Sequence, residues 1–171
     1  MSEQRDDVDL SPNLAIHLAG RAVHRALWID FNLRAAWPWI DPTLRRCMVQ
    51  LWLTPQRKAL KHLGYTREGV VEALVVDEPR HRLWSVYESA QIQRFAQGAP
   101  EGIESWVMTV DTEPLAPDVE RLALYAPPAA GDVADGPWVT LVMRYAGGAG
   151  WRLLSFDEDV PVPTPGWPPT L

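Results

Sequence analysis

One histidine and several carboxylates are the side chains of this 171-residue chain that could move protons. His81 falls in the first turn of a predicted helix that also carries Trp84 and Tyr87, close enough in sequence to face one cavity. A neutral imidazole there could serve as a general base, with Asp30 or Asp157 as its acidic partner. Such a set would suit a dehydratase or isomerase acting on a small carbonyl compound. The simpler interpretation is a surface histidine.

Patterns typical of other chemistry are missing from the sequence. His17 and His24 are seven residues apart on one predicted helix, but no cysteine or acid joins them at metal-ligand spacing. The single cysteine, Cys47, has no activating neighbour in sequence, and no Gly-x-Ser-x-Gly motif occurs. The glycine-rich run 147–150 lacks the ending of a phosphate loop, so we predict a hairpin turn there. We expect no metal and no cofactor.

Aromatic residues offer a second kind of site. The chain has nine tryptophans, and tryptophan combines a large apolar area with a polar tip, which suits thick cores, pockets and subunit interfaces. Trp167 lies in a proline-rich tail that could dock onto the body of the protein or onto a second subunit. The residues expected to line a ligand pocket are Trp37, Trp84, Tyr87, Trp106, Met143 and Tyr145.

Three functional hypotheses follow from these residues. The leading one is a non-catalytic domain, forming a homodimer, that binds a small apolar ligand or a protein partner through a tryptophan-rich concave surface. The second is the acid–base enzyme described above. The third is an accessory or immunity-type structural partner, motivated by the acidic charge and by the tail that carries Trp167.

Charge and composition narrow the partners and the compartment. The net charge of −6 opposes binding to nucleic acid or to an anionic membrane surface. A lone cysteine forms no internal disulfide, and residues 1–10 lack the apolar segment of a signal peptide. No apolar run reaches the ~18 residues that a membrane span requires. We therefore expect a cytoplasmic protein.

The first part of the chain is predicted to be helical. In the first helix the predicted apolar stripe is Leu14, Leu18, Ala22, Ala26, Ile29 and Leu33. Asp41 and Thr66 are expected to cap later helices, and Gly64 and Gly98 to follow helix ends. In the last helix the predicted stripe is Leu83, Val86, Tyr87 and Ala90. The predicted helices cover 12–37, 42–53, 55–63, 67–76 and 80–97.

After Gly98 the apolar period changes to two residues, which indicates strands. Strands are predicted at 106–110 and 118–126, followed by a hairpin over 138–157. The register predicted for that hairpin pairs Met143 with Leu154, Leu141 with Phe156 and Val142 with Ser155. The predicted fold is α+β, with N-terminal helices packed on a curved C-terminal antiparallel sheet. It comprises a loose N-terminus (1–11), one domain (12–160) and an extended proline-rich tail (161–171).

The order of these elements, with the segments DPTLR (Asp41 to Arg45) and GWRLLSF (Gly150 to Phe156), resembles the nuclear-transport-factor-2-like superfamily. The resemblance covers about residues 12–160. It implies a cone-shaped α+β fold whose sheet curls around a pocket closed by the helices, and dimerisation through the sheet. It also implies that enzymes of this type place an Asp–His pair in the pocket, and no such pair is matched in this chain.

Overall fold

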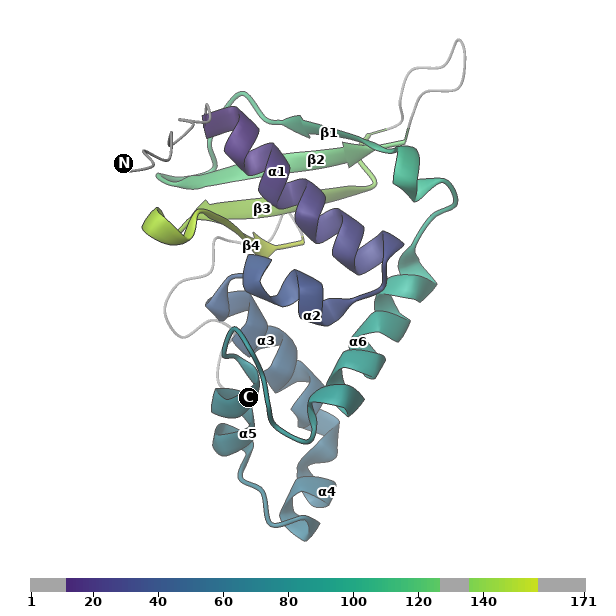
Figure 1. Cartoon of the computed structure of the whole chain (residues 1–171), viewed down its shortest axis with the longest axis vertical. Coiled ribbons are helices and arrows are strands. Elements are labelled where there is room, and N and C mark those ends of the chain that lie inside the picture. Colours follow the sequence, from purple (N-terminus) through teal and green to yellow (C-terminus); the bar gives the residue numbers. More distant parts are fainter. Residues whose placement is uncertain (1–11, 127–135, 157–171) are drawn as a thin grey trace, which may run out of the picture.

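An antiparallel sheet caps a tapering body of helices in the computed structural model, which describes residues 12–126 and 136–156 (Figure 1). The strands are β1 (Val107–Val110), β2 (Val119–Tyr125), β3 (Val139–Tyr145) and β4 (Trp151–Ser155), in the spatial order β1-β2-β3-β4. The predicted α+β class, with helices before an antiparallel sheet, is confirmed. Residues 1–11, Asp157 and the tail with Trp167 lie outside the described residues.

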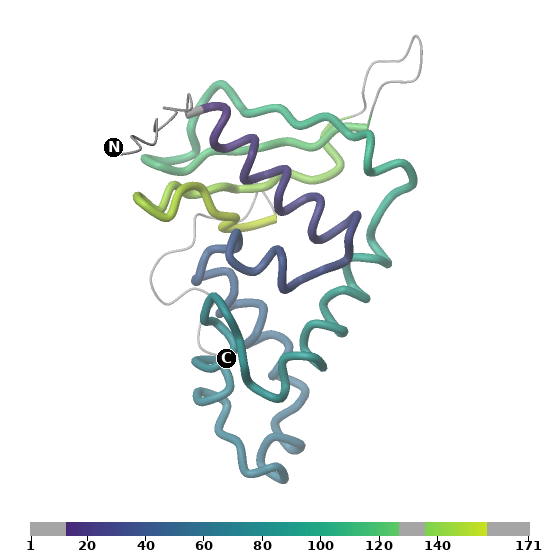
Figure 2. Tube along the Cα trace, in the orientation of Figure 1, coloured from purple at the N-terminus to yellow at the C-terminus, as the bar shows by residue number. Residues whose placement is uncertain are grey.

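The helices divide between the sheet and the tapering body. α1 crosses the inner face of the sheet and contacts all four strands, and the later helices extend below it (Figures 1 and 2). Short 3-10 turns connect several of them. The α-helices are α1 (Pro12–His24), α2 (Leu33–Ala36), α3 (Pro42–Leu53), α4 (Arg57–His62), α5 (Arg67–Leu74) and α6 (Trp84–Gly98).

The predicted single helix over 12–37 is wrong, because the chain bends after α1. A π-helical turn, Arg25–Ile29, ends at Asp30, and Phe31 then takes a left-handed backbone conformation with φ of 46°. Asn32 restarts the helix, since its side-chain oxygen accepts the N–H of Ala35 at 2.9 Å. A local side-chain cap of this kind competes with helix continuation, and sequence periodicity does not detect it.

The apolar stripe predicted for the first helix is also displaced. Leu14 and Leu18 are about half exposed, whereas Ile16, Ala19 and Val23 are buried against the sheet. Gly20 explains why this face of α1 packs on the sheet, because only a residue without a side chain fits there. A Cβ atom on Gly20 would lie 2.0 Å from Cδ2 of Leu122. The helix therefore turns its small residues toward the sheet, which lets the backbone approach closely.

The last helix starts later than predicted, at Trp84. Val86 is exposed, contrary to the predicted stripe, while Trp84, Tyr87 and Gln91 are buried. Gly98 lies inside the helix and not after it. The predicted helix caps are confirmed, because Asp41 accepts the N–H of Thr43 and Thr66 accepts the N–H of Gly69. Gly64 follows a helix end as predicted, with a φ of 75°.

The hairpin register is correct on one side of a bulge and wrong on the other. Near the turn, Tyr145 pairs with Trp151 and Met143 with Leu153, one residue away from the prediction. The N–H of Ala146 donates to the carbonyl of Gly150, so these two residues face each other and the turn spans 147–149, one residue fewer than the predicted loop. An irregularity between Val142 and Met143 restores the predicted pair of Val142 with Ser155.

Two successive leucines of β4 are buried on opposite faces of the sheet, as the alternation of side chains along a strand requires. Leu153 joins the main core between sheet and helices, and Leu154 packs with Val119 and Val142 on the outer face. Leu141 is buried and Phe156 is half-buried against the main core. Met143, Leu141 and Phe156 therefore share the inner face as predicted, but Leu153 takes the place predicted for Leu154.

Candidate functional site

Of the residues predicted to form an acid–base set, His81 and Asp30 do not contact one another, and each contacts other residues. Nδ1 of His81 accepts the N–H of Leu83 at 3.2 Å, and its ring lies 5.1 Å from that of Tyr65. Asp30 is exposed and forms an ion pair with Arg25 at 3.1 Å. Within residues 12–126 and 136–156, no histidine lies within 4.0 Å of a carboxylate. The third candidate, Asp157, lies outside the described residues.

Three of the six predicted pocket residues do come together, but as packed core. The ring of Trp37 lies 5.1 Å from Trp84 and 5.7 Å from Tyr87, and Trp52 completes the group at 5.3 Å from Tyr87. Trp37, Trp84 and Tyr87 are almost fully buried. The indole N–H of Trp37 is shared between the carbonyls of Leu74 and Val76. These four residues form what we call the aromatic core.

Two polar atoms of the aromatic core are buried without a partner among the described residues. They are Nε1 of Trp84 and the hydroxyl oxygen of Tyr87. Burial raises the pKa of the Tyr87 hydroxyl, so it stays protonated. Buried polar groups normally have a partner, and an ordered water or the polar end of a ligand would supply one.

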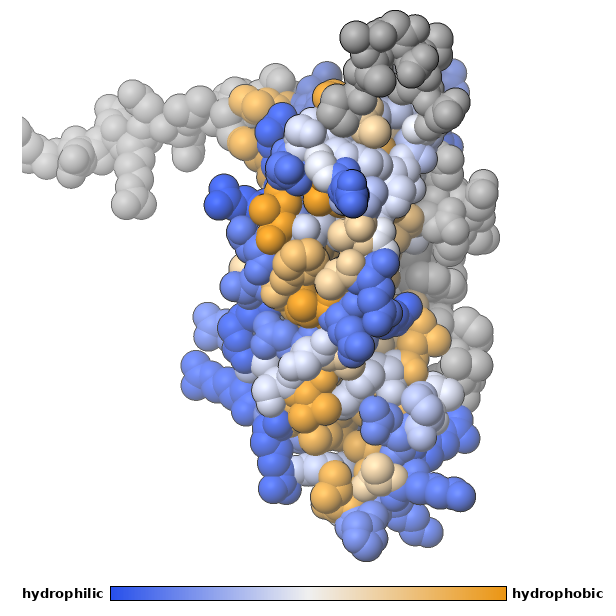
Figure 3. Space-filling model, turned by 90° about the vertical axis from the view of Figure 1, so that its right-hand side faces the viewer, coloured by the Kyte–Doolittle hydropathy of each residue, from blue (hydrophilic) through white to orange (hydrophobic). Residues whose placement is uncertain are grey.

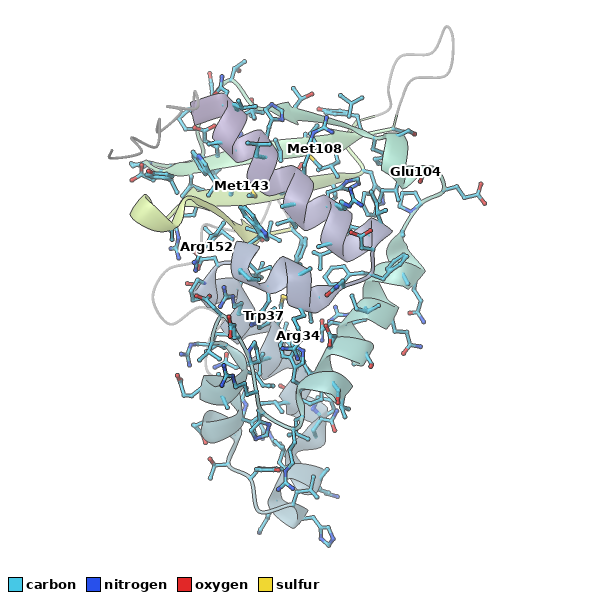
Figure 4. All side chains as sticks on the ribbon, viewed as in Figure 1. Arg34, Trp37, Glu104, Met108, Met143 and Arg152 are labelled. Carbon is cyan, nitrogen blue, oxygen red and sulfur yellow. The ribbon has the colours of Figure 1, made fainter. Side chains whose placement is uncertain are left out.

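The other predicted pocket residues lie elsewhere. Met143 is buried on the inner face of the sheet, beneath α1 (Figure 4). Trp106 is half-buried, 5.3 Å from Trp138. Tyr145 is exposed beside Trp151 at 5.6 Å. The six residues therefore do not line one pocket.

Trp28 is the organising residue that the sequence analysis missed. Its ring lies 5.6 Å from Phe95, 5.4 Å from Trp138 and 6.0 Å from Phe156. Trp28 therefore packs between α6, which carries Phe95, and the end of the sheet where β3 begins and β4 ends. Only the tertiary arrangement joins these residues, because they come from distant parts of the chain.

His24 is buried next to Trp28, with ring centroids 6.0 Å apart. Burial lowers the pKa of His24, and a hydrogen bond to the backbone of Ile103 partly opposes that shift. Its Nε2 has no partner among the described residues. No carboxylate of residues 12–126 or 136–156 lies within 4.0 Å of it, so the described part of the chain gives it the surroundings of a core histidine.

Arg45 carries a deeply buried charge, with a side chain that is 1% exposed. Its guanidinium donates to the carbonyls of Ile40 and Val75 and forms an ion pair with Asp77 at 2.6 Å. It also lies 5.5 Å from the centre of the Trp37 ring. Burial lowers the pKa of Arg45, and the hydrogen bond to Asp77 opposes that change. All these contacts are internal, so Arg45 connects α3 to the segment after α5.

Cys47 is buried in α3, and burial raises the pKa of its thiol to about 11. The thiolate is the reactive form of cysteine, so Cys47 is inert at neutral pH. This agrees with its predicted role as a helix-core residue.

A groove of about 330 Å³ lies on the outer face of the sheet. Strands β1, β2 and β3 contribute Thr109, Arg121, Tyr125 and Thr140 to its lining. Arg121 forms an ion pair of 2.8 Å with Asp111 at the end of β1, and this contact lowers the pKa of Asp111. Its lining mixes these side chains with apolar ones such as Val110 and Ala123, unlike the tryptophan-rich concave surface expected from the sequence.

The two edges of the sheet differ. At the β4 edge, Ile40 forms a parallel bridge with Leu153, and the N–H of Asp41 donates to the carbonyl of Leu153 at 2.8 Å. At the other edge, β1 pairs only with β2 in the described part of the chain. One edge is therefore covered at Leu153 by the turn at Ile40, and the other, which we call the open edge, has no further strand partner among the described residues.

The register identifies which backbone groups of β1 face outward. The β1–β2 register, continued by one residue, places Asp111 opposite Arg121. The N–H of Asp111 donates to the carbonyl of Arg121 at 3.0 Å, so this is a hydrogen-bonded pair. Hydrogen-bonded and non-hydrogen-bonded pairs alternate in an antiparallel ladder. Thr109 therefore also faces β2, while the N–H and C=O groups of Met108 and Val110 point away from it.

The side of the molecule that carries α6 has a mixed surface. Figure 3 shows apolar patches separated by charged side chains on the side of the molecule that carries α6. Exposed apolar residues such as Val86 and Leu51 are scattered in this way, which is ordinary for a protein surface.

Comparisons with known proteins found no matching family model, no matching curated protein and no matching solved structure. Among the described helices, none has the length and apolar character needed to cross a membrane. No group of three or more potential metal ligands occurs within the described residues.

Proposed function

We propose that this chain is a non-catalytic interaction domain that binds an extended segment of a partner protein along the open edge of β1. The supporting observation is the outward-facing backbone of Met108 and Val110, at the one edge of the sheet that nothing described covers. In strand addition, main-chain hydrogen bonds provide affinity and neighbouring side-chain pockets provide specificity.

The side chains beside this edge indicate what the partner segment would carry. Val107 is half exposed and Thr109 is exposed, and both side chains lie on the outer face. Residues of the added strand would stand opposite them, where β-branched or aromatic side chains pair best. The adjoining groove with Arg121 and Asp111 would take a polar side chain from the same segment.

A second copy of this chain would be a weaker partner at the same edge. β1 has four residues, so two β1 edges pairing alone would bury far less than the ~1,200 Å² of a stable interface. A foreign segment that also fills the groove would bury more. Three expectations from the sequence stay predictions. They are the homodimer, the cytoplasmic location and the nuclear-transport-factor-2-like architecture.

A small apolar ligand is the second candidate. It is favoured by the unpartnered polar atoms of Trp84 and Tyr87 within the aromatic core. A ligand with one polar group among those rings would change tryptophan fluorescence and raise the melting temperature. A panel of apolar alcohols and ketones that leaves both unchanged would remove this candidate.

The test of the leading proposal is selection of peptides from a random displayed library, followed by affinity measurement on two variants. Val110→Pro removes the outward N–H at an edge position, where proline is tolerated in a sheet. We expect it to weaken binding by about tenfold or more, since it removes a main-chain bond and adds a steric clash. Val110→Ala keeps the N–H and should bind within about threefold of the parent.

Each outcome decides between the alternatives. Selected peptides that bind Val110→Pro as well as the parent would contradict the proposal, and so would a library that yields no binder. Sedimentation of the free chain forms a parallel arm. A dimer that Val110→Pro dissociates and Val110→Ala leaves intact would identify a second copy as the occupant of the same edge.

A further inference from the structure

The outer face of the sheet carries a small apolar patch that is separate from the main core. We call it the outer patch, and its members are Val119 of β2, Val142 of β3 and Leu154 of β4. The main core lies on the other face, which α1 crosses (Figure 1). The exposed fractions of the three residues are only 3%, 1% and 0%, whereas Val107, on the outer face of β1, is 51% exposed. One half of the outer face is therefore covered and the other half is not.

The described residues supply part of that cover. Leu115 and Ala116 pack against the outer patch, and no other apolar residue in 12–126 or 136–156 joins the cluster. Their N–H groups donate to the carbonyl of Val119 at 2.9 and 3.3 Å, so this turn lies at β2. β4 is two strand spacings away from β2, roughly 10 Å. A second apolar segment is therefore needed over Val142 and Leu154.

The chain outside the described residues has three segments, and their points of attachment favour one of them. Residues 1–11 precede α1, which crosses the inner face. Residues 127–135 lie between the end of β2 and the start of β3, whereas the outer patch uses the first residue of β2. Residues 157–171 begin two positions after Ser155, which pairs with Val142 of the outer patch. The C-terminal segment therefore starts beside the patch.

The composition of this segment suits packing on the face of a sheet and not pairing at its edge. Val160 and Val162 alternate with prolines at 161, 163 and 165. Proline has no N–H to give a strand ladder, and such a run favours an extended helix with three residues per turn. The apolar run 160–163 covers a full turn, so it presents an apolar side chain in every direction. At about 3.1 Å per residue, the two valines come roughly 15 and 22 Å after Ser155, which is enough chain to turn back across the outer patch.

We propose that residues 157–163 fold back across the outer face of β3 and β4, with Val160 and Val162 packed on Val142 and Leu154. We call this segment the strap. Its contacts are made by side chains, so it covers the sheet without adding a strand. The strap is separate from the β1 edge and does not depend on strand addition.

Nuclear Overhauser effects between methyl groups test the strap in the full chain, labelled at its valine and leucine methyls. We expect contacts from the methyls of Val142 or Leu154 to those of Val160 or Val162. Contacts of the outer patch only with residues 1–11, 127–135 or 164–171 would overturn the proposal, and so would the absence of any contact with the strap. In a mixture of labelled and unlabelled chains, contacts between copies would identify a second copy as the cover and would also overturn it.

Two full-length double variants give an independent measurement. Val160→Asp with Val162→Asp places charge against the outer patch, so we expect the melting temperature to fall by about 3 °C or more and an apolar dye to bind. Thr164→Asp with Thr170→Asp adds the same charge to the same segment beyond the strap, and it should shift the melting temperature by less than about 1 °C. Equal shifts in the two double variants, or no rise in dye binding for the first, would contradict the proposal.

Discussion

The carboxylate of Asp41 joins the start of α3 to the sheet by holding Arg144 of β3. Nε of Arg144 lies 3.0 Å from Oδ2 of Asp41, and Nη2 lies 2.6 Å from Oδ1. The same Oδ1 accepts the N–H of Thr43, the capping bond that the sequence predicts. Asp41 is 1% exposed, so its charge depends on these partners.

Arg144→Gln should therefore destabilise the fold. It leaves the buried carboxylate without its cation, and breaking a fully buried pair costs about 3–5 kcal/mol. The Arg144 side chain is one-third exposed, so we expect a smaller loss, about 2 kcal/mol in the free energy of unfolding in urea.

The matched control for this pair is Arg25→Gln. It breaks an ion pair between two exposed side chains, Arg25 and Asp30. Such pairs contribute about 0–1 kcal/mol, so unfolding should change little. Equal effects of the two variants would contradict the structural role assigned to Asp41.

Gly20→Ala tests the close approach of α1 to the sheet. Alanine favours a helix over glycine by up to about 1 kcal/mol, but overpacking a core costs about 1–3 kcal/mol. The added Cβ would clash with the fully buried Leu122, so we expect a net destabilisation of about 1 kcal/mol. Thermal and urea unfolding measure it.

Gly98→Ala is the control for that substitution, because a Cβ there meets nothing within 4 Å. It lies at the end of α6 and should be neutral or slightly stabilising. If Gly20→Ala were to stabilise the protein as much as Gly98→Ala, the packing of α1 on Leu122 would be looser than described.

His24 predicts a specific dependence of stability on pH. Burial lowers the pKa of His24 in the folded state below its value of 6.5 in the unfolded chain. The unfolded state then binds more protons between those two values, so this contribution is complete above pH 6.5 and is lost as the pH falls toward the folded pKa. The slope has a ceiling of about 1.4 kcal/mol per pH unit for one proton.

The variant His24→Gln removes this contribution and leaves every other titrating group in place. The free energy of unfolding of the parent should fall more steeply than that of the variant as the pH is lowered from 7.5 to 5. A difference between the two proteins that stays constant over this range would show that His24 titrates normally in the folded chain.

Local signals in the sequence predicted local structure well. Asp41 and Thr66 cap helices as expected, because a cap requires only a side chain and the backbone two or three residues later. The face of α1 was wrong because it depends on the contact of Gly20 with Leu122, a hundred residues away. Likewise, the register near the hairpin turn was wrong because it depends on the bond from Ala146 to Gly150, which leaves one residue fewer in the turn than predicted.

The candidate sites were less accessible to sequence reasoning. Trp37, Trp84 and Tyr87 were correctly associated, but whether they enclose space or fill it depends on side-chain packing. The open edge of β1 depends on which strand ends the sheet and on the turn at Ile40 that closes the other edge.

Amide hydrogen exchange along β1 in the free monomer tests the central claim most directly, because the claim concerns individual backbone N–H groups. The account predicts an alternation: Thr109 and Asp111, which donate toward β2, exchange slowly, whereas Met108 and Val110 exchange fast. Protection of Val110 equal to that of Thr109 would mean that the edge is already covered, and it would contradict binding by strand addition.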